Sequence, residues 1–155
     1  MLKVHIWLPE GPLVGHASLS FGDNYVSFWP AEGADKKDLK IKRSHPGAFV
    51  EALLDDIRSE NGRQPKTVII PFADEAALQS FVIALQRNVP RYQLARYNCS
   101  HLVAECLRVA CNKDATFIPT AQDYGRIGKL LGRGIWTPQE ILRYAQELAS
   151  ERENG

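Results

Sequence analysis

The chain has 155 residues, of which 45% are hydrophobic and 24% are charged, and its formal net charge is +1. This length suits one domain, and the composition is that of an ordinary globular protein. The balanced charge gives no reason to expect a nucleic-acid partner. No apolar run is long enough to span a bilayer, and the first residues lack the pattern of a secretory signal. We therefore expect a single domain over residues 1–155 that stays in the cytoplasm, unless a specialised, signal-independent system exports it.

The three cysteines, Cys99, Cys106 and Cys111, lie close together in the sequence. Their odd number and close spacing argue against a disulfide framework, so the thiols are expected to be free. No CxxC pair and no histidines at metal-ligand spacing accompany them. We therefore expect no metal ion and no other cofactor.

The first residues predict antiparallel strands. Residues 2–8 alternate between apolar and polar side chains and predict a strand, and residues 15–21 predict a second. Residues 22–24, Gly-Asp-Asn, have the composition of a tight turn, and residues 25–29 read as the returning strand. The second and third strands are therefore predicted to form a hairpin, which Pro30 ends.

The rest of the chain predicts helices and one short strand. After a charged, solvated loop over residues 31–45, a helix is predicted to begin at Pro46 and to end at Asn61. Its apolar stripe comprises Phe49, Val50, Leu53, Leu54 and Ile57. The remaining predicted elements are a strand over 67–72 and helices over 74–85, 98–110 and 137–148, with an irregular segment over 112–136. This order predicts an α+β fold, a small antiparallel sheet packed with helices.

The start of the last predicted helix has a sequence typical of a helix N-terminus. Thr137 stands at the expected N-cap, Pro138 at the first helical position and Glu140 at the third. This pattern predicts a capping box, in which the two polar side chains bond to each other's backbone N–H groups.

Cys99 is predicted at the first turn of the helix over residues 98–110. Unpaired N–H groups and the positive end of the dipole at a helix N-terminus stabilise a thiolate, which favours nucleophilic chemistry near neutral pH. Cys99 also continues the apolar stripe of its helix and is expected to face the sheet. The alternative is a buried, inert cysteine, because free cysteines are often buried. Cys106 and Cys111 lack the help of the dipole and are interpreted as structural.

A thiol nucleophile needs a base, and histidine is suited to that task. His101 follows Cys99 by two positions on the same helix, so the two side chains point in different directions. His45 is expected to be exposed, and His5 is a core or edge residue of the first strand. His16 opens the second strand between two small neighbours and is the best candidate by elimination. Its alternative is a strand histidine that bonds to the backbone.

Two segments carry a resemblance to a known family. Residues 16–26, HASLSFGDNYV, place a histidine at the start of a strand, followed by a Gly-Asp turn and a returning strand. Residues 98–103, NCSHLV, place the cysteine at a helix start. These segments resemble the two signatures of the lecithin:retinol acyltransferase-like group, in the circularly permuted branch of the NlpC/P60 papain-like fold. With Pro30 and the Trp136–Pro138 tripeptide, the chain is also similar to bacterial permuted NlpC/P60 domains, some of which are secreted antibacterial toxins.

The resemblance implies a third polar residue on the returning strand that orients the imidazole of His16. Ser27 is the candidate at that place, with Asn24 as the fallback. Ser100 stands where the acyltransferase-like signature has a glutamate. The backbone N–H of Cys99 is expected to hold the oxyanion. The second donor is left open among Gln93, Tyr97 and Asn98.

The resemblance also implies the reaction. A cysteine-dependent acyl hydrolase or acyltransferase working through a thioester is expected, with phospholipid acyl esters as the first substrate class. Cleavage of amide bonds in peptidoglycan peptides or proteins is the alternative, and a catalytically silent binding module is the second alternative. The expected partners are thus a lipid or peptide substrate and, for a toxin, an immunity or inhibitor protein. The basic, glycine-rich residues 125–134 predict a solvated loop, and contact with a membrane surface is the alternative.

Overall fold

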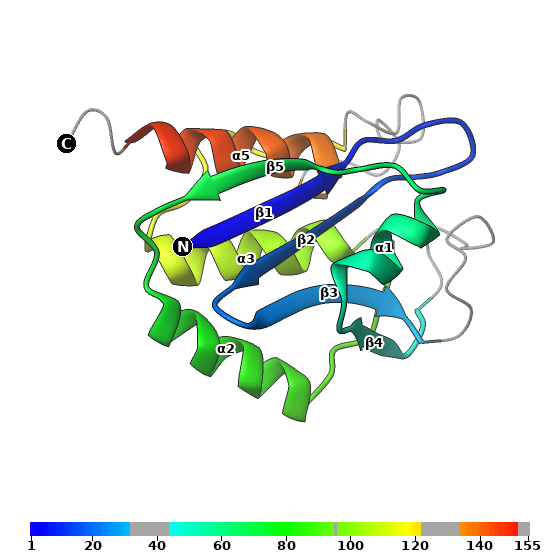
Figure 1. Ribbon diagram of the computed structural model, residues 1–155, viewed down its shortest axis with the longest axis horizontal. Coiled ribbons are helices and arrows are strands. Elements are labelled where there is room, and N and C mark those ends of the chain that lie inside the picture. Colours follow the sequence, from blue (N-terminus) through cyan, green and yellow to red (C-terminus); the bar gives the residue numbers. More distant parts are fainter. Residues whose placement is uncertain (32–43, 95, 122–133, 152–155) are drawn as a thin grey trace.

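Figure 1 shows the computed structural model, which describes residues 1–31, 44–94, 96–121 and 134–151. It contains a five-stranded sheet in the order β4-β3-β2-β1-β5, and all neighbouring strands are antiparallel. The strands are β1 (Leu2–Trp7), β2 (His16–Phe21), β3 (Asn24–Pro30), β4 (Gly47–Val50) and β5 (Lys66–Ile70). The predicted α+β class and the β2–β3 hairpin are confirmed.

The helices of the described residues are α1 (Leu53–Ser59), α2 (Glu75–Arg87), α3 (Cys99–Cys111) and α5 (Pro138–Ser150). Helix α3 packs against β2 and β3, α5 packs against β1 and β5, and α2 packs against α3. Helix α1 lies on the other face of the sheet, in front of the strands in Figure 1. Among the described residues, no helix combines the length and the apolar character needed to cross a bilayer.

Strand alternation divides the sheet into two chemically different faces. One face is apolar and joins the core cluster with residues of α3 and α5, because side chains of a strand alternate between faces. Its fully buried members on β1 and β2 are Leu2, Val4, Ile6, Ala17 and Leu19. The hydrophobic effect of burying this face is what holds the helices on the sheet.

The opposite face carries polar and aromatic side chains. Trp7 pairs with His16 and His5 pairs with Ser18 across β1 and β2, so these four side chains share that face. Although polar, His5, His16 and Ser18 are buried. Helix α1 covers part of this face, so a buried polar layer lies between α1 and the sheet.

Strands β2 and β3 separate beyond their shared turn. Residues 19–21 pair with residues 24–26, whereas residues 27–30 pair with β4 on the other side. Figure 1 shows β2 and β3 diverging from the hairpin. Helix α3 packs against both of these strands.

The prediction of a helix that begins at Pro46 is wrong over residues 47–50. Residues 47–50 form β4, which pairs with β3, and the Phe28 and Phe49 rings lie 5.6 Å apart across the pair. A Cβ added at Gly47 would lie under 3.0 Å from the carbonyl oxygen of Pro90, so only glycine fits this close approach. The helical part is only Leu53–Ser59. Pairing across the sheet overrides the local apolar spacing here.

The prediction of a capping box at the start of the last helix is also wrong, because the expected hydrogen bond from the helix backbone to the Thr137 side chain is absent. Thr137 is the N-cap of α5 and Pro138 opens the helix, but the Thr137 side chain makes no capping bond to the backbone. Glu140 instead accepts hydrogen bonds from the backbone N–H groups of Thr120 and Ala121, and from the Thr137 hydroxyl at 3.0 Å. Glu140 thus ties the preceding segment to α5.

Two expectations concern residues that lie mostly outside the described part of the chain. These are the solvated loop over residues 31–45 and the basic segment over residues 125–134. Of the irregular segment predicted over residues 112–136, residues 112–121 and 134–136 are described, and they contain no helix or strand.

Candidate active site

His16 is held at the start of β2 by a backbone that only glycine can supply. Gly15 has a φ of +81°, and a Cβ there would lie under 3.0 Å from the Trp7 carbonyl oxygen. His16 itself is 0% exposed. Its ring lies between two indoles, with centroid distances of 5.7 Å to Trp7 and 4.7 Å to Trp29. The imidazole therefore packs against two aromatic rings.

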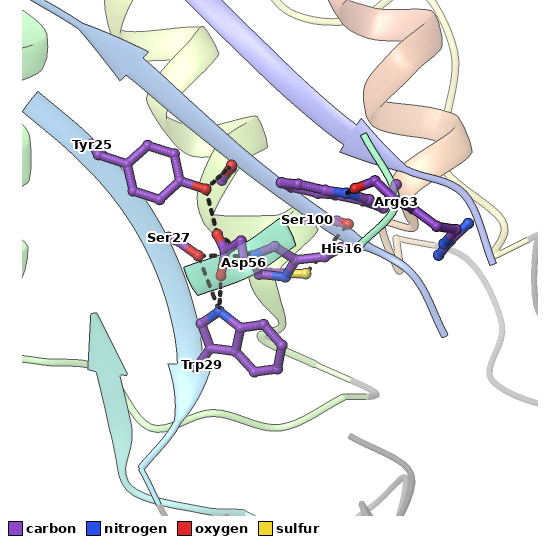
Figure 2. A network of polar contacts seen from close by, with 10 residues as sticks. His16, Tyr25, Ser27, Trp29, Asp56, Arg63 and Ser100 are labelled. Atoms are coloured by element: carbon purple, nitrogen blue, oxygen red, sulfur yellow. Dashed lines mark hydrogen bonds and ion pairs between the residues drawn. The ribbon is translucent and has the colours of Figure 1, made fainter. Parts of the chain in front are cut away.

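The Nε2 atom of His16 faces two oxygen atoms. Ser27 Oγ lies at 2.7 Å and Asp56 Oδ2 at 3.3 Å, and the side chains of His16 and Asp56 are 0% and 1% exposed. Figure 2 shows His16, Ser27 and Asp56 converging from β2, β3 and α1. The contact between His16 and Ser27, predicted from sequence, is present. The carboxylate beside them was not predicted.

Asp56 is surrounded by hydrogen-bond donors. The Tyr25 hydroxyl donates to Oδ2, and the Trp29 indole N–H donates to Oδ1 at 2.8 Å and to Ser27 Oγ at 3.1 Å. Tyr25 in turn lies 2.8 Å from the hydroxyl of Ser18. A buried carboxylate is costly unless such partners compensate for the lost water, and here both of its oxygens are bonded.

The balance of these effects favours the ionised carboxylate. Burial alone would raise the pKa of Asp56, but the hydrogen bond and the charge of His16, with hydrogen bonds from Ser27 and Tyr25, lower it to about 2. The same carboxylate and burial raise the pKa of Tyr25 well above its usual value, so Tyr25 stays a neutral donor. Asp56 is therefore a negative charge placed to stabilise a protonated His16.

Cys99 is the first residue of α3 and is 4% exposed. Its sulfur lies 4.0 Å from the hydroxyl oxygen of Ser100, and Figure 2 places Ser100 in the same network of polar contacts as His16. As predicted, the apolar stripe that Cys99 begins is buried along α3. The thiol thus stands at the positive end of a helix that packs against the strand of His16.

The N-terminus of α3 is closed by a capping box that sequence reasoning missed. The Asn98 side chain accepts a hydrogen bond from the His101 backbone N–H at 3.0 Å, and His101 Nδ1 accepts from the Asn98 N–H at 3.3 Å. His101 Nε2 lies 3.1 Å from the Gly134 carbonyl oxygen. Burial lowers the pKa of His101 to about 4, so it stays neutral, which suits its role as an acceptor. His101 therefore helps to fix the conformation of the N-terminus of α3.

Two of the three expected oxyanion donors are committed elsewhere. The Asn98 amide donates to the carbonyl oxygens of Leu94 and Trp136, each at 3.0 Å, which uses both of its hydrogens. The Tyr97 hydroxyl donates to Glu105 at 2.7 Å. Asn98 is therefore wrong as a donor, and Tyr97 has its hydroxyl hydrogen occupied. Gln93 stays a prediction.

Other residues weighed from the sequence have different roles. Asn24 is exposed at the hairpin turn and donates to the Phe21 carbonyl, so the fallback for the third residue is wrong. His45 was expected to be exposed but is 9% exposed, because its backbone pairs with Tyr92. His5 bonds to Thr67 and Ser20, and burial lowers its pKa to about 4.

Cys106 and Cys111 lie deeper along α3 and at its end. Burial raises the pKa of both thiols, and the charge of Glu105 adds to the effect at Cys106. Neither has the position of Cys99 at the first turn of the helix. A thiol that holds its proton is a poor nucleophile.

The sequence gives little indication that Asp56 is buried. The helix was predicted from Pro46, with Leu54 in the apolar stripe, but Leu54 is 54% exposed and Asp56 is 0% exposed. Once the helix begins at Leu53, Asp56 lies three positions later and next to Ile57, on the inward side. The signal that could have identified Asp56 is a carboxylate on the inward side of the helix, together with hydroxyl and indole donors on the hairpin.

A separate pocket of about 150 Å³ lies away from this network. It is lined by His101, Glu105 and Arg108 of α3 together with Trp136 and Tyr144, and neither Cys99 nor His16 contributes to it. No group of three or more metal-ligating side chains occurs in the part of the chain that the structure describes.

Comparisons of this chain with models of protein families, with curated proteins and with solved structures find no match.

Proposed function

We propose that this protein is a cysteine-dependent acyl hydrolase or acyltransferase, with Cys99 as the nucleophile and His16 as its base. Ser27 and Asp56 orient the imidazole and stabilise its charged form. The observation that carries the proposal is the fully buried His16–Asp56 pair, with Nε2 and Oδ2 3.3 Å apart. A carboxylate buried beside a histidine is costly to desolvate, and such perturbed titratable groups cluster at functional sites.

The arrangement supports a complete acyl-transfer cycle. Because Nε2 of His16 faces Asp56, Nδ1 is the nitrogen that takes the proton from the Cys99 thiol. The sulfur attacks the acyl carbonyl carbon, and the oxyanion is held by backbone N–H groups at the helix start. The bond to the leaving group breaks, the leaving group takes the proton from His16, and an acyl thioester remains. The oxygen of water or of another acceptor then attacks the thioester carbonyl carbon while His16 takes its proton, the C–S bond breaks, and Cys99 leaves as a thiolate that the His16 proton can neutralise.

Phospholipid acyl esters are the first proposed substrate class. The support is the likeness of residues 16–26 and 98–103 to the acyltransferase-like signatures. Ester hydrolysis needs a thiolate and an oxyanion site, and its alkoxide leaving group needs comparatively little help from an acid.

Cleavage of amide bonds is the second candidate, and one observation favours it. An amine leaving group must be protonated as it departs, so an amidase depends on a charged imidazole that serves as acid. Asp56, with a pKa lowered to about 2, is ionised under all ordinary conditions and stabilises that acid. Peptidoglycan peptides are the amide substrate that we propose to test.

The test is substrate turnover read by mass spectrometry. The purified protein is incubated with vesicles of phosphatidylcholine and phosphatidylglycerol, and separately with a muropeptide mixture. We expect products from one of the two, and we expect Cys99→Ala to lower the rate by at least about a thousandfold, because the covalent route is lost. Cys111→Ala is the matched control, since it removes a thiol from the other end of the same helix and should keep most of the activity.

The two arms have separate meanings. Fatty-acid release from vesicles supports the lipid acyl hydrolase, and cleaved muropeptides support the amidase. If neither substrate shows turnover that depends on Cys99, the catalytic proposal is overturned in favour of a binding module without activity.

A further inference from the structure

We infer that Trp29 is a positioning residue for this chemistry: one indole sets both the plane of the His16 imidazole and the direction of the Asp56 carboxylate. The inference rests on the proposed function. It adds a residue that neither the two sequence segments nor the base and its carboxylate would identify.

The geometry gives Trp29 two contacts with the pair at once. Its ring stacks on His16 at 4.7 Å between centroids, with the two planes inclined by 30°. Its N–H donates to Asp56 Oδ1 at 2.8 Å and to Ser27 Oγ at 3.1 Å. The indole therefore contacts the imidazole itself and also Ser27 and Asp56, both of which face His16 Nε2. Figure 2 shows Ser27, Trp29 and Asp56 gathered around His16.

These contacts act on the charged form of His16. The face of an indole attracts a cation stacked on it, so Trp29 favours imidazolium over neutral imidazole. The N–H bond fixes Oδ1, which leaves Oδ2 turned toward Nε2 of His16. A hydrogen bond to a carboxylate is stronger than one between neutral groups. Trp29 thus raises the population of the thiolate–imidazolium form without contacting a substrate.

Charged side chains reach His16 from few of the surrounding elements. Helix α1 contributes the buried Asp56, whereas its Asp55 and Arg58 are exposed. Strand β3 contributes Tyr25, and on β1 His5 bonds to Thr67 and Ser20, with Lys3 beyond it. Because burial keeps Tyr25 neutral and lowers the pKa of His5 to about 4, Asp56 is the charged neighbour of His16 among these groups between pH 5 and pH 8.

The test is the pH dependence of Cys99 alkylation by iodoacetamide, with each cysteine followed by peptide mapping. In Trp29→Phe, which keeps a ring face and removes the N–H, imidazolium loses stability relative to neutral imidazole, so a larger share of the pair is neutral thiol beside neutral imidazole. We expect the alkylation rate of Cys99 at pH 6 to fall about tenfold and the rate at pH 9 to stay unchanged.

Trp7→Phe is the matched control. Trp7 is also buried and also flanks His16, at 5.7 Å, but its indole N–H donates to the Arg63 carbonyl instead of Asp56. Its substitution should lower the melting temperature and leave the alkylation rate at pH 6 unchanged. Equal profiles for Trp29→Phe and the wild-type protein, or equal shifts in both tryptophan variants, would overturn the inference.

Two further arms keep the test decisive. Trp29→Tyr also removes the indole N–H while keeping a ring, and it replaces Trp29→Phe if that variant does not unfold cooperatively. A wild-type profile that His16→Ala leaves unchanged would overturn the proposed function itself, and the inference with it. A pH profile that changes in His16→Ala but not in Trp29→Phe would overturn only the role of Trp29.

Discussion

Replacing Asp56 by asparagine is expected to lower turnover by about a hundredfold or more while the protein stays folded. The amide has the same shape as the carboxylate: its single oxygen can still accept from Trp29, and its NH2 group, in the place of Oδ2, can donate to the Tyr25 hydroxyl oxygen. It carries no charge, so the imidazolium form of His16 loses its stabilising partner at 3.3 Å. The measurement is the steady-state rate on the substrate identified by mass spectrometry, at several pH values.

Asp55→Asn is the matched control for this change. Asp55 is the preceding residue on α1, but its side chain is 58% exposed and pairs only with Arg58, at 3.9 Å. Such a surface pair contributes little, so we expect no change in rate beyond about twofold. Equal losses in the two variants would show that Asp56 acts only through the general charge of the helix, and this would contradict its assigned place beside His16.

The same variant has a consequence for acid stability. The pKa of Asp56 falls from 3.8 in the unfolded chain to about 2 in the folded protein. A lowered pKa means that the stabilisation is present above pH 3.8 and is lost as the pH falls toward 2, and its size is about 2 kcal/mol. Urea denaturation between these pH values should show this loss in the wild-type protein and a smaller one in Asp56→Asn.

Replacing Gly15 by alanine is expected to have the largest effect on stability, a loss of about 3 kcal/mol or more in the free energy of unfolding. The φ of +81° disfavours any Cβ, and the added carbon would also meet the Trp7 carbonyl oxygen at under 3.0 Å. The strain falls on the residue next to His16, so the reactivity of Cys99 should drop as well. Urea denaturation and Cys99 alkylation measure the two effects.

Gly11→Ala separates the two causes. Gly11 also has a positive φ, +56°, but a Cβ there meets nothing within 4 Å. We expect it to cost about 1 kcal/mol, from the backbone conformation alone. If Gly15→Ala is no more destabilising than Gly11→Ala, the Trp7 carbonyl oxygen does not exclude a Cβ at Gly15, and the close approach of the two chain segments there is contradicted.

The parts of the fold that were predictable are those with local signals. The Gly-Asp turn and the alternation on either side of it define the β2–β3 hairpin, whose two strands carry His16 and Ser27, 2.7 Å apart between Nε2 and Oγ. The position of Cys99 at the start of α3 followed from an apolar stripe and a polar residue before it. Each of these features depends on residues close together in the sequence.

The missed features depend on residues far apart. Strand β4 exists because it pairs with β3, and its own four residues look as much like a helix as like a strand. Asp56 is buried because donors from β2 and β3 surround it, whereas Asp55 beside it is exposed. Two adjacent aspartates with opposite environments cannot be told apart until the sheet is assembled.

The most direct measurement of the central claim is the relative alkylation rate of the three cysteines at pH 6, resolved by peptide mapping, in the wild-type protein and in His16→Ala. If His16 takes the proton of Cys99, Cys99 reacts at least about ten times faster than Cys106 and Cys111, and this advantage disappears in His16→Ala. A Cys99 that reacts no faster than the other two, or whose rate does not depend on His16, would contradict the account.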